Sequence, residues 1–223
     1  MILLTGGSCV RMAASCGDKS LALVADKPVF LHSLLAIDSA GIFSDVTIVI
    51  RDEAQQREIE RYLGAVNLCA KVSCVQGGDS RQKSVLNALI HAQHSRPDFV
   101  LIHDAARPLI AKDCMHLLLS ALGDHDAAVL AHKATDTLMD VSGDKRNYLL
   151  RDTIWHIETP QIFRYEVILD AYLKAKGPLT DDSSALPEST RMKIIENFTP
   201  NIKITYPQDF ATVKALLSSN SVK

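Results

Sequence analysis

The chain has 223 residues, of which 47% are hydrophobic and 22% are charged, a balance typical of one globular domain with a single core. Its 24 basic and 26 acidic residues give a formal net charge of −2, which excludes a nucleic acid or a membrane surface as a partner attracted by overall charge. No apolar run approaches the roughly 18 residues that a membrane-spanning helix needs, and the apolar start is too short for a signal peptide, so we expect a cytoplasmic protein. Five cysteines without a Cys-x-x-Cys pair argue against a disulfide framework or a structural zinc site.

Strand and helix patterns alternate as far as Ala131. Short apolar runs predict buried strands, and apolar residues at helical spacing or polar caps predict helices. The predicted strands are 2–4, 46–50, 71–75, 99–103 and 127–131, and the predicted helices are 28–40, 52–63, a helix from about 81, and 112–122. This order predicts an α/β fold with a mostly parallel, doubly wound sheet.

The alternation stops at Ala134. Residues 134–155 carry charge and Gly143 but no helical period, which predicts a projecting hairpin that turns at 142–145. A helix at 165–175, a strand at 202–205 and a last helix opened by Pro207 follow. We therefore expect a single domain, 1–223, with a projecting β-arm at 134–155.

The loop after the first strand combines small residues with two cations. Thr5, Gly6 and Gly7 let backbone N–H groups approach phosphate oxygens, and Arg11 and Lys19 add fixed positive charge. The loop matches neither the Walker pattern nor the dinucleotide fingerprint. An ordinary tight turn explains it equally well, so it indicates a nucleoside triphosphate site only together with other motifs.

Two further clusters follow later strands, at the carboxyl ends where open α/β sheets bind ligands. The glycines and hydroxyls of 77–84 suit a base and ribose, although Asp79 and Ser80 also explain them as a capped helix start. Asp104 ends a buried strand, where a carboxylate needs a partner. Either Arg107 is that partner in a structural ion pair, or Asp104 helps to place a magnesium–triphosphate complex or a substrate hydroxyl.

Taken in chain order, the motifs resemble those of one known family. They are GGSxxRM with a downstream lysine, GGDSRxxSV, LIHDAARP, the Asp136-Thr137 pair, R-x3-W-x3-TPQxF, TDDSS and NIKIT. From Ile2 to about Val213 the chain resembles the 2-C-methyl-D-erythritol 4-phosphate cytidylyltransferase family of the non-mevalonate isoprenoid pathway. The resemblance implies a Rossmann-like nucleotidyltransferase fold and an arm that clasps a second copy in a homodimer. It also implies transfer of a cytidylyl group from CTP to the methylerythritol phosphate, with Mg²⁺ and release of pyrophosphate.

The resemblance further implies a role for each matching residue. The implied catalytic residues are Arg11, Lys19, Arg151 and Lys203. The implied nucleotide contacts are Thr5, Gly6, Gly7, Gly78, Asp79, Ser84 and Ala105. The implied acceptor contacts are Asp104, Thr137, Arg151, Thr159 and Lys203, of which Thr137 and Arg151 reach the neighbouring subunit's site. Asp104 is also the candidate magnesium ligand.

The sequence departs from the family pattern beside the first loop. Cys9 stands where the family has a second glycine, and Asp18 stands where it has a proline before Lys19. We expect the carboxylate of Asp18 to weaken the field of Lys19 on the phosphates. Two other functions fit the same residues: a cytidylyltransferase for ribitol 5-phosphate or a similar pentitol phosphate, and a non-catalytic nucleotide-binding protein. A plain structural module explains none of the spacing.

Overall fold

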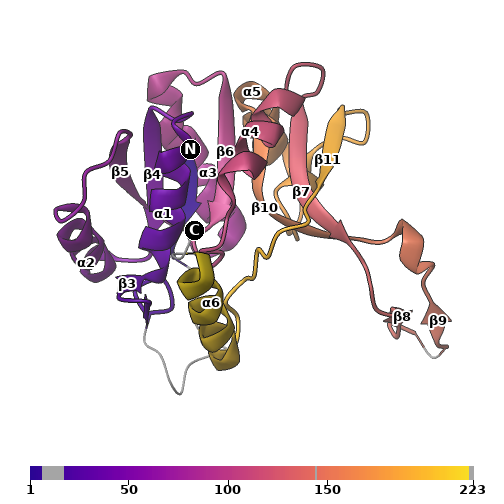
Figure 1. Cartoon of the computed structure of the whole chain (residues 1–223). Coiled ribbons are helices and arrows are strands. Elements are labelled where there is room, and N and C mark those ends of the chain that lie inside the picture. The colour runs from indigo at the N-terminus through magenta and orange to yellow at the C-terminus, as the bar shows by residue number, and fades with distance from the viewer. Residues whose placement is uncertain (7–17, 144, 221–223) are drawn as a thin grey trace.

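The computed structural model describes residues 1–6, 18–143 and 145–220. In this part of the chain a seven-stranded sheet has the order β11-β7-β10-β6-β1-β4-β5 (Figure 1). Its strands are β1 Ile2–Leu4, β4 Asp45–Ile50, β5 Lys71–Gln76, β6 Phe99–Asp104, β7 Ala127–Lys133, β10 Trp155–Arg164 and β11 Met192–Glu196. Neighbouring strands are parallel except that β10 is antiparallel to β6 and β7. The prediction of a mostly parallel α/β sheet is therefore confirmed.

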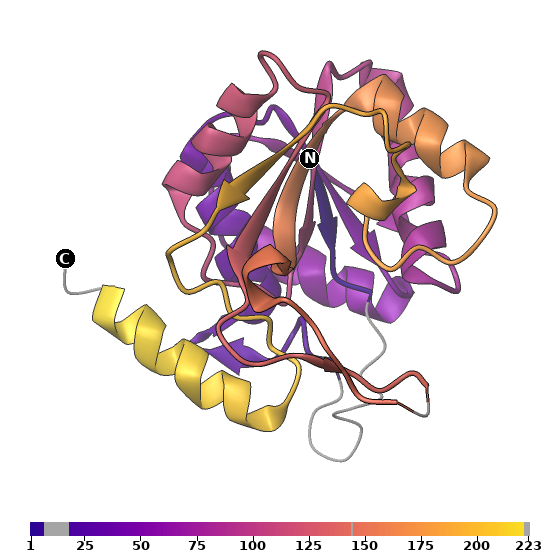
Figure 2. The same ribbon diagram turned by 90° about the vertical axis from the view of Figure 1, so that its right-hand side faces the viewer.

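Helices cover both faces of the sheet, as Figure 2 shows. One face packs against α1 Val29–Ala40, α2 Glu53–Leu63 and α4 Lys112–Ala121, and the other against α3 Arg81–Ala92 and α5 Tyr165–Lys174. Successive side chains of β6 alternate between the faces: Leu101 belongs to the first layer, and Val100 and Ile102 belong to the second. A strand buried on both sides reads as an unbroken apolar run, which is why the sequence predicts β6 well.

Side-chain caps start two helices at the carboxyl ends of strands. Asp52 accepts a hydrogen bond from the backbone N of Gln55 at 2.8 Å, and Ser80 accepts one from the backbone N of Lys83 at 3.1 Å. Each cap satisfies one of the free N–H groups at a helix start. The caps fix where α2 and α3 begin, immediately after β4 and β5, so both helix N-termini lie at the same edge of the sheet.

A smaller apolar cluster lies beyond that edge. It joins Val24 and Val29 to Ile204 and to Val213 of α6 Pro207–Asn220, beside the short pair β2 Leu23–Val24 and β3 Lys27–Pro28. The predicted strand at 202–205 is wrong: this described stretch forms no strand, and the backbone N of Ile204 donates to the backbone O of Ala106 at 2.8 Å. Ile204 is buried against α6 rather than in the sheet, so its apolar character reflects helix packing.

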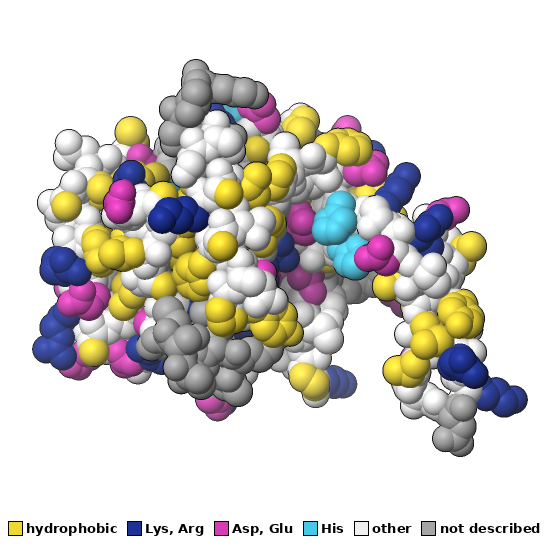
Figure 3. Space-filling model, turned by 60° about the horizontal axis from the view of Figure 1, so that its bottom comes forward, with side chains coloured by type: hydrophobic (Ala, Val, Ile, Leu, Met, Phe, Trp, Pro, Cys, Tyr) yellow, Lys and Arg dark blue, Asp and Glu magenta, His cyan; other side chains and the backbone are white. Residues whose placement is uncertain are grey.

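The chain leaves the body between β7 and β10. There β8 Met139–Asp140 and β9 Asn147–Tyr148 form an antiparallel pair, followed by a 3-10 turn at Arg151–Thr153. Figures 1 and 3 show this hairpin projecting from the body. The division into one domain with an arm stays a prediction. Among the described residues, no helix combines the length and the apolar character that crossing a bilayer requires.

Candidate active site

A cavity of about 400 Å³ lies at the carboxyl ends of the parallel strands. β1 and β6 end there and α3 begins there, which is the position where open α/β sheets bind ligands. It is lined by Leu4, Thr5, Gly6, Lys19, Ser20, Gly78, Asp79, Ser80, Arg81, Ser84, Asp104, Ala106 and Lys203. Of the sequence-predicted residues, the fold therefore brings together Thr5, Gly6, Lys19, Gly78, Asp79, Ser84, Asp104 and Lys203.

Charged side chains from distant parts of the chain interlock on one wall of the cavity. The carboxylate of Asp104 lies 2.5 Å from Nζ of Lys203 and 3.3 Å from Nη2 of Arg81. The guanidinium of Arg81 also donates two hydrogen bonds of 2.7 Å to Asp182, which accepts a further bond from the hydroxyl of Tyr172. These five residues are called the Asp104 network below. Opposite charges alternate along it, so burial leaves no charge unmatched.

The network holds Asp104 and Arg81 in their charged forms. Burial opposes ionisation of Asp104, but the charges of Arg81 and Lys203 and the hydrogen bond from Lys203 hold the pKa of Asp104 well below its usual range. Burial likewise opposes the charge of Arg81, but the hydrogen bonds and charge of Asp182, with the charge of Asp104, raise the pKa of Arg81. The cavity therefore presents fixed charges at neutral pH.

Arg81 and Asp182 are central to the Asp104 network, and the sequence analysis assigned a role to neither residue. Arg81 is the first residue of α3, where the positive end of the helix dipole disfavours a cation. A cation at that position indicates an acidic partner from elsewhere, and this was the available signal. Asp182 has a side chain that is 0% exposed, which nothing in the sequence TDD reveals.

Arg107 does not pair with Asp104 as the structural alternative predicted. Its guanidinium donates to the backbone O of Asn201 at 2.7 Å and lies 3.9 Å from the carboxylate of Glu158. The prediction is wrong because the partner of Asp104 is set by which elements adjoin the end of β6. Those elements are the start of α3 and the segment that carries Lys203.

Two predicted residues form hydrogen bonds with the backbone of strands that end at the cavity. The hydroxyl of Thr159 accepts a hydrogen bond of 3.1 Å from the backbone N of Asp104, and Thr5 donates from its hydroxyl to the backbone O of Val49 at 2.6 Å. Ala105 is fully buried in the core and does not line the cavity, whereas Ala106 does. The predicted nucleotide contact of Ala105 stays a prediction.

The turn before α3 brings backbone close to the cavity. A Cβ on Gly78 would lie 2.4 Å from Cβ of Lys83, so only glycine fits this turn without a shift. The backbone N of Gly78 donates to the hydroxyl of Ser84 at 3.1 Å. Asp79 forms an exposed ion pair of 2.6 Å with Lys83. This arrangement offers backbone and hydroxyl groups to a ligand that lies over the start of α3.

The remaining predicted residues fall in two other places. Gly7 and Arg11 lie outside the described residues, as does Cys9. Thr137 and Arg151 lie in the arm and are exposed, and neither lines the cavity of its own chain. Arg151 donates to the backbone O of Thr135 at 3.1 Å, a bond that ties the 3-10 turn to the other leg of the arm.

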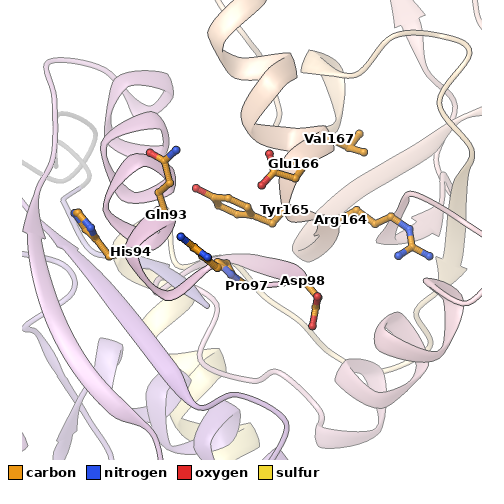
Figure 4. Close-up of a pocket in the computed structure, with 9 residues that line it drawn as sticks. Gln93, His94, Pro97, Asp98, Arg164, Tyr165, Glu166 and Val167 are labelled. Atoms are coloured by element: carbon orange, nitrogen blue, oxygen red, sulfur yellow. The ribbon is translucent and has the colours of Figure 1, made fainter.

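A second hollow, of about 710 Å³, lies at the opposite edge of the sheet (Figure 4). It is lined by Gln93, His94, Arg96, Pro97, Asp98, Arg164, Tyr165, Glu166 and Val167. This edge holds the start of β6 and the end of β10. The hollow is larger, but none of the residues predicted from the motifs lines it.

The donor set for a metal is small. No group of three or more His, Cys, Asp or Glu side chains suited to a metal ion occurs within the described ranges. Asp104 contributes one buried carboxylate at the cavity. Mg²⁺ is commonly held by one or two carboxylates together with substrate phosphates, and Asp104 fits that arrangement.

Known proteins with matching sequence and structure share this fold. The IspD family, 2-C-methyl-D-erythritol 4-phosphate cytidylyltransferase, matches residues 1–219. Proteins of that name from Aquifex aeolicus and Paraburkholderia phymatum are 38% and 35% identical, covering 89% of this chain and 89% and 88% of their own lengths. The crystal structure of 4-diphosphocytidyl-2C-methyl-D-erythritol synthase from Anaerococcus prevotii superimposes with a TM-score of 0.84 at 25% identity, covering 97% of this chain and 94% of that one. With the cavity at the expected edge of the sheet, these matches confirm the resemblance: the chain belongs to the 2-C-methyl-D-erythritol 4-phosphate cytidylyltransferase family.

Proposed function

We propose that this protein transfers the cytidylyl group of CTP to 2-C-methyl-D-erythritol 4-phosphate, giving 4-CDP-2-C-methyl-D-erythritol and pyrophosphate for isoprenoid precursor synthesis. The observation that carries the proposal is the convergence of Lys19, Arg81 and Lys203 on one cavity at the carboxyl edge of the sheet, in a chain of this family. The reaction brings two anions together, and such a cavity suits that task.

The transfer needs no nucleophile from the protein. A phosphate oxygen of the acceptor attacks the α-phosphorus of CTP and forms a new P–O bond. The bond between the α-phosphorus and its bridging oxygen breaks, and pyrophosphate leaves with the electron pair. The enzyme aligns the two substrates and offsets the growing negative charge.

The side chains around the cavity divide this work. Lys19, with Arg11, would stabilise charge on the α-phosphate and the leaving group. Lys203 would hold the acceptor phosphate beside Asp104. Because Lys203 and Asp104 are 2.5 Å apart before ligand binds, the ammonium is already placed at the cavity wall and little ordering is needed on binding.

The nucleotide would lie over the start of α3. Gly78 permits close backbone approach there, and Ser84 and Asp79 line the same side. The helix N-terminus adds free N–H groups and a favourable dipole for negative charge. Magnesium is part of the proposal: Asp104 would help to hold the ion together with the triphosphate, and the ion would supply positive charge to the triphosphate.

We also propose that the arm joins two copies in a homodimer. Exposed apolar side chains cluster on and next to its hairpin, at Met139, Val141, Tyr148 and Leu150, and Figure 3 shows hydrophobic surface on the arm. An exposed apolar group of this kind marks an interaction surface. In such a dimer Thr137 and Arg151 would complete the partner's acceptor site. The cytoplasmic location stays a prediction.

Mixed dimers test the role of Arg151. Arg151→Ala should raise KM for the acceptor and spare CTP, because it would remove a binding contact. The Arg151→Ala and Lys203→Ala proteins are mixed in equal amounts, allowed to exchange subunits and assayed at an acceptor concentration well below the raised KM, where each variant alone turns over slowly. One site of each mixed dimer then regains both residues. Activity should then recover to roughly a quarter of wild type. No recovery, with exchange verified by mass, would place Arg151 in its own chain's site or outside any site.

Pyrophosphate release tests the function itself. Purified protein with Mg²⁺ and CTP is offered methylerythritol phosphate and ribitol 5-phosphate in parallel. Release with methylerythritol phosphate alone is expected. The comparisons do not favour the pentitol phosphate alternative, and release with that acceptor alone would replace the proposed substrate. Silence with both acceptors, in folded protein that binds CTP, would favour the non-catalytic alternative.

A further inference from the structure

A buried glutamine connects the two chain segments that flank the first loop. Gln55, in the first turn of α2, is 1% exposed. Its Oε1 accepts a hydrogen bond of 2.6 Å from the backbone N of Arg51. Its Nε2 donates to the backbone O of Thr5 at 3.2 Å, to Oδ2 of Asp18 at 2.7 Å and to Oγ of Ser20 at 3.2 Å. A donor on one side and acceptors on the other fit only one orientation of the amide.

Asp18 has both carboxylate oxygens engaged in the same cluster. Oδ1 accepts hydrogen bonds from the backbone N of Ser20 at 2.9 Å and from its hydroxyl at 2.6 Å. Oδ2 accepts from Gln55 and lies 3.1 Å from Nη1 of Arg51. We expected the carboxylate of Asp18 to weaken the positive field of Lys19, its neighbour in the sequence. The charge of Arg51 offsets that carboxylate.

The contacts of Gln55 reach described residues before and after the first loop. Thr5 lies at the carboxyl end of β1, and Asp18 and Ser20 bracket Lys19 on the far side of the loop. Thr5, Lys19 and Ser20 line the cavity, whereas Gln55 and Asp18 do not. Gln55 therefore sets the separation between Thr5 and Ser20, which line the cavity, although it does not line the cavity itself.

We propose that Gln55, Asp18 and Arg51 form a positioning unit that fixes Lys19 for the transfer step. This inference rests on the proposed function, in which Lys19 offsets charge on the α-phosphate. A held cation stabilises a transition state better than one that must be ordered during the reaction. Gln55 holds the backbone O of Thr5 on one side of the loop and the side chains of Asp18 and Ser20 on the other. Arg51 keeps the charge of Asp18 from opposing that of Lys19.

Steady-state kinetics separate positioning from general stability. Gln55→Met keeps the side-chain volume and removes every amide contact, so kcat should fall about 10- to 100-fold while KM for the acceptor stays within about twofold. Tyr165→Phe is the matched control, because it removes another buried hydrogen bond, to the backbone O of Leu89, and should leave kcat unchanged. An unchanged kcat in folded Gln55→Met, or an equal loss in both variants, would overturn the proposal.

A charge-pair series keeps the test decisive if Gln55→Met does not fold. Arg51→Gln leaves the Asp18 carboxylate uncompensated and should lower kcat. The double variant Arg51→Gln/Asp18→Asn removes both charges and should restore kcat to within about threefold of wild type. A double variant no better than Arg51→Gln would contradict the charge-balancing role.

Chemical labelling distinguishes failure of this inference from failure of the proposed function. The rate at which an amine-reactive reagent modifies Lys19 is read by mass spectrometry, with Lys214 on α6 as the internal reference. In Gln55→Met or Arg51→Gln the Lys19 rate should change about threefold or more relative to Lys214. If wild-type protein releases no pyrophosphate, the proposed function fails, and an unchanged Lys19 rate in both variants still overturns the positioning role.

Discussion

The two edges of the central sheet use charged side chains differently. At the amino edge, Arg164 donates to the backbone O of Leu122 and lies 3.7 Å from Asp126, so it fastens the loop between α4 and β7 to the end of β10. At the carboxyl edge, Arg81 and Lys203 meet Asp104 around an open space. The amino-edge hollow is the larger, at about 710 Å³ against about 400 Å³. Convergence of charge, rather than size, therefore distinguishes the site.

Removing a carboxylate at each edge should show the largest difference. Asp182→Ala leaves Arg81 and Tyr172 without their shared acceptor, so the free energy of unfolding should fall by about 3 kcal/mol, near the lower end for a buried ion pair because the Arg81 side chain is 37% exposed. Asp126→Ala should cost about 1 kcal/mol or less, because its partners Arg164 and Arg191 are 46% and 66% exposed. Urea unfolding of both variants checks the contrast, which equal losses would remove.

Acid should weaken the fold through the carboxyl edge. Burial lowers the pKa of His103 from 6.5 to about 4. The charges of Arg107 and Lys203 also lower this pKa, whereas the charge of Asp104 raises it. The unfolded chain binds a proton at His103 below about pH 6.5, and the folded chain does so only near pH 4. As the pH is lowered from 6.5 to 4, the free energy of unfolding therefore falls by about 1.4 kcal/mol per pH unit. No such contribution exists above pH 6.5, where both states are neutral.

Histidines at the two edges provide the control. His103→Gln should flatten the pH dependence of unfolding between pH 6.5 and 4, and His94→Gln, exposed at the amino edge, should leave it unchanged. A wild-type slope in His103→Gln would show that the buried histidine does not carry the effect.

Lys19→Ala tests whether charge at the carboxyl edge serves catalysis. Loss of a cation that stabilises the transition state should reduce kcat about 100-fold or more. Lys214→Ala removes an exposed lysine of α6 and serves as the reference. Turnover in Lys19→Ala that matches the reference would remove Lys19 from the proposed mechanism.

The smallest effect is expected at the amino-edge hollow. Glu166 lines it and is exposed, and Glu166→Gln should change kcat and both KM values by no more than about twofold, as for an ordinary surface substitution. A larger change in either KM would show that the two edges communicate.

The sequence predicted those elements whose pattern is local. The β-branched run of β4 and the Asp52 cap of α2 need no knowledge of the rest of the chain. β10 and β11 were missed: β10 mixes polar residues with Pro160 at its centre, and its pairing with β7 shifts register between Ile157 and Gln161 of β10. An irregular strand of this kind has no clean period to read.

The site divides in the same way. The motifs indicated the residues that line the cavity, because glycines, hydroxyls and cations after strands form a local pattern. The partners of Asp104 depend on the order of strands and on α3, which the motifs do not encode. Gln55 lies in a mostly polar helix in which only Ile59 is also buried, so its burial follows from contacts with Thr5 and Asp18 that only the fold creates.

The strand order interleaves the two halves of the chain. β10, which follows the arm, lies between β6 and β7, which precede it. A chain cut between β8 and β9 would therefore consist of two polypeptides held together by the hydrogen bonds of one sheet. A strand of the second polypeptide, β10, would lie between two strands of the first. Neither piece alone supplies neighbours for all its strands, so separate expression would leave β6 and β7 with open edges. The arm tip is thus where this enzyme could be divided into complementing fragments.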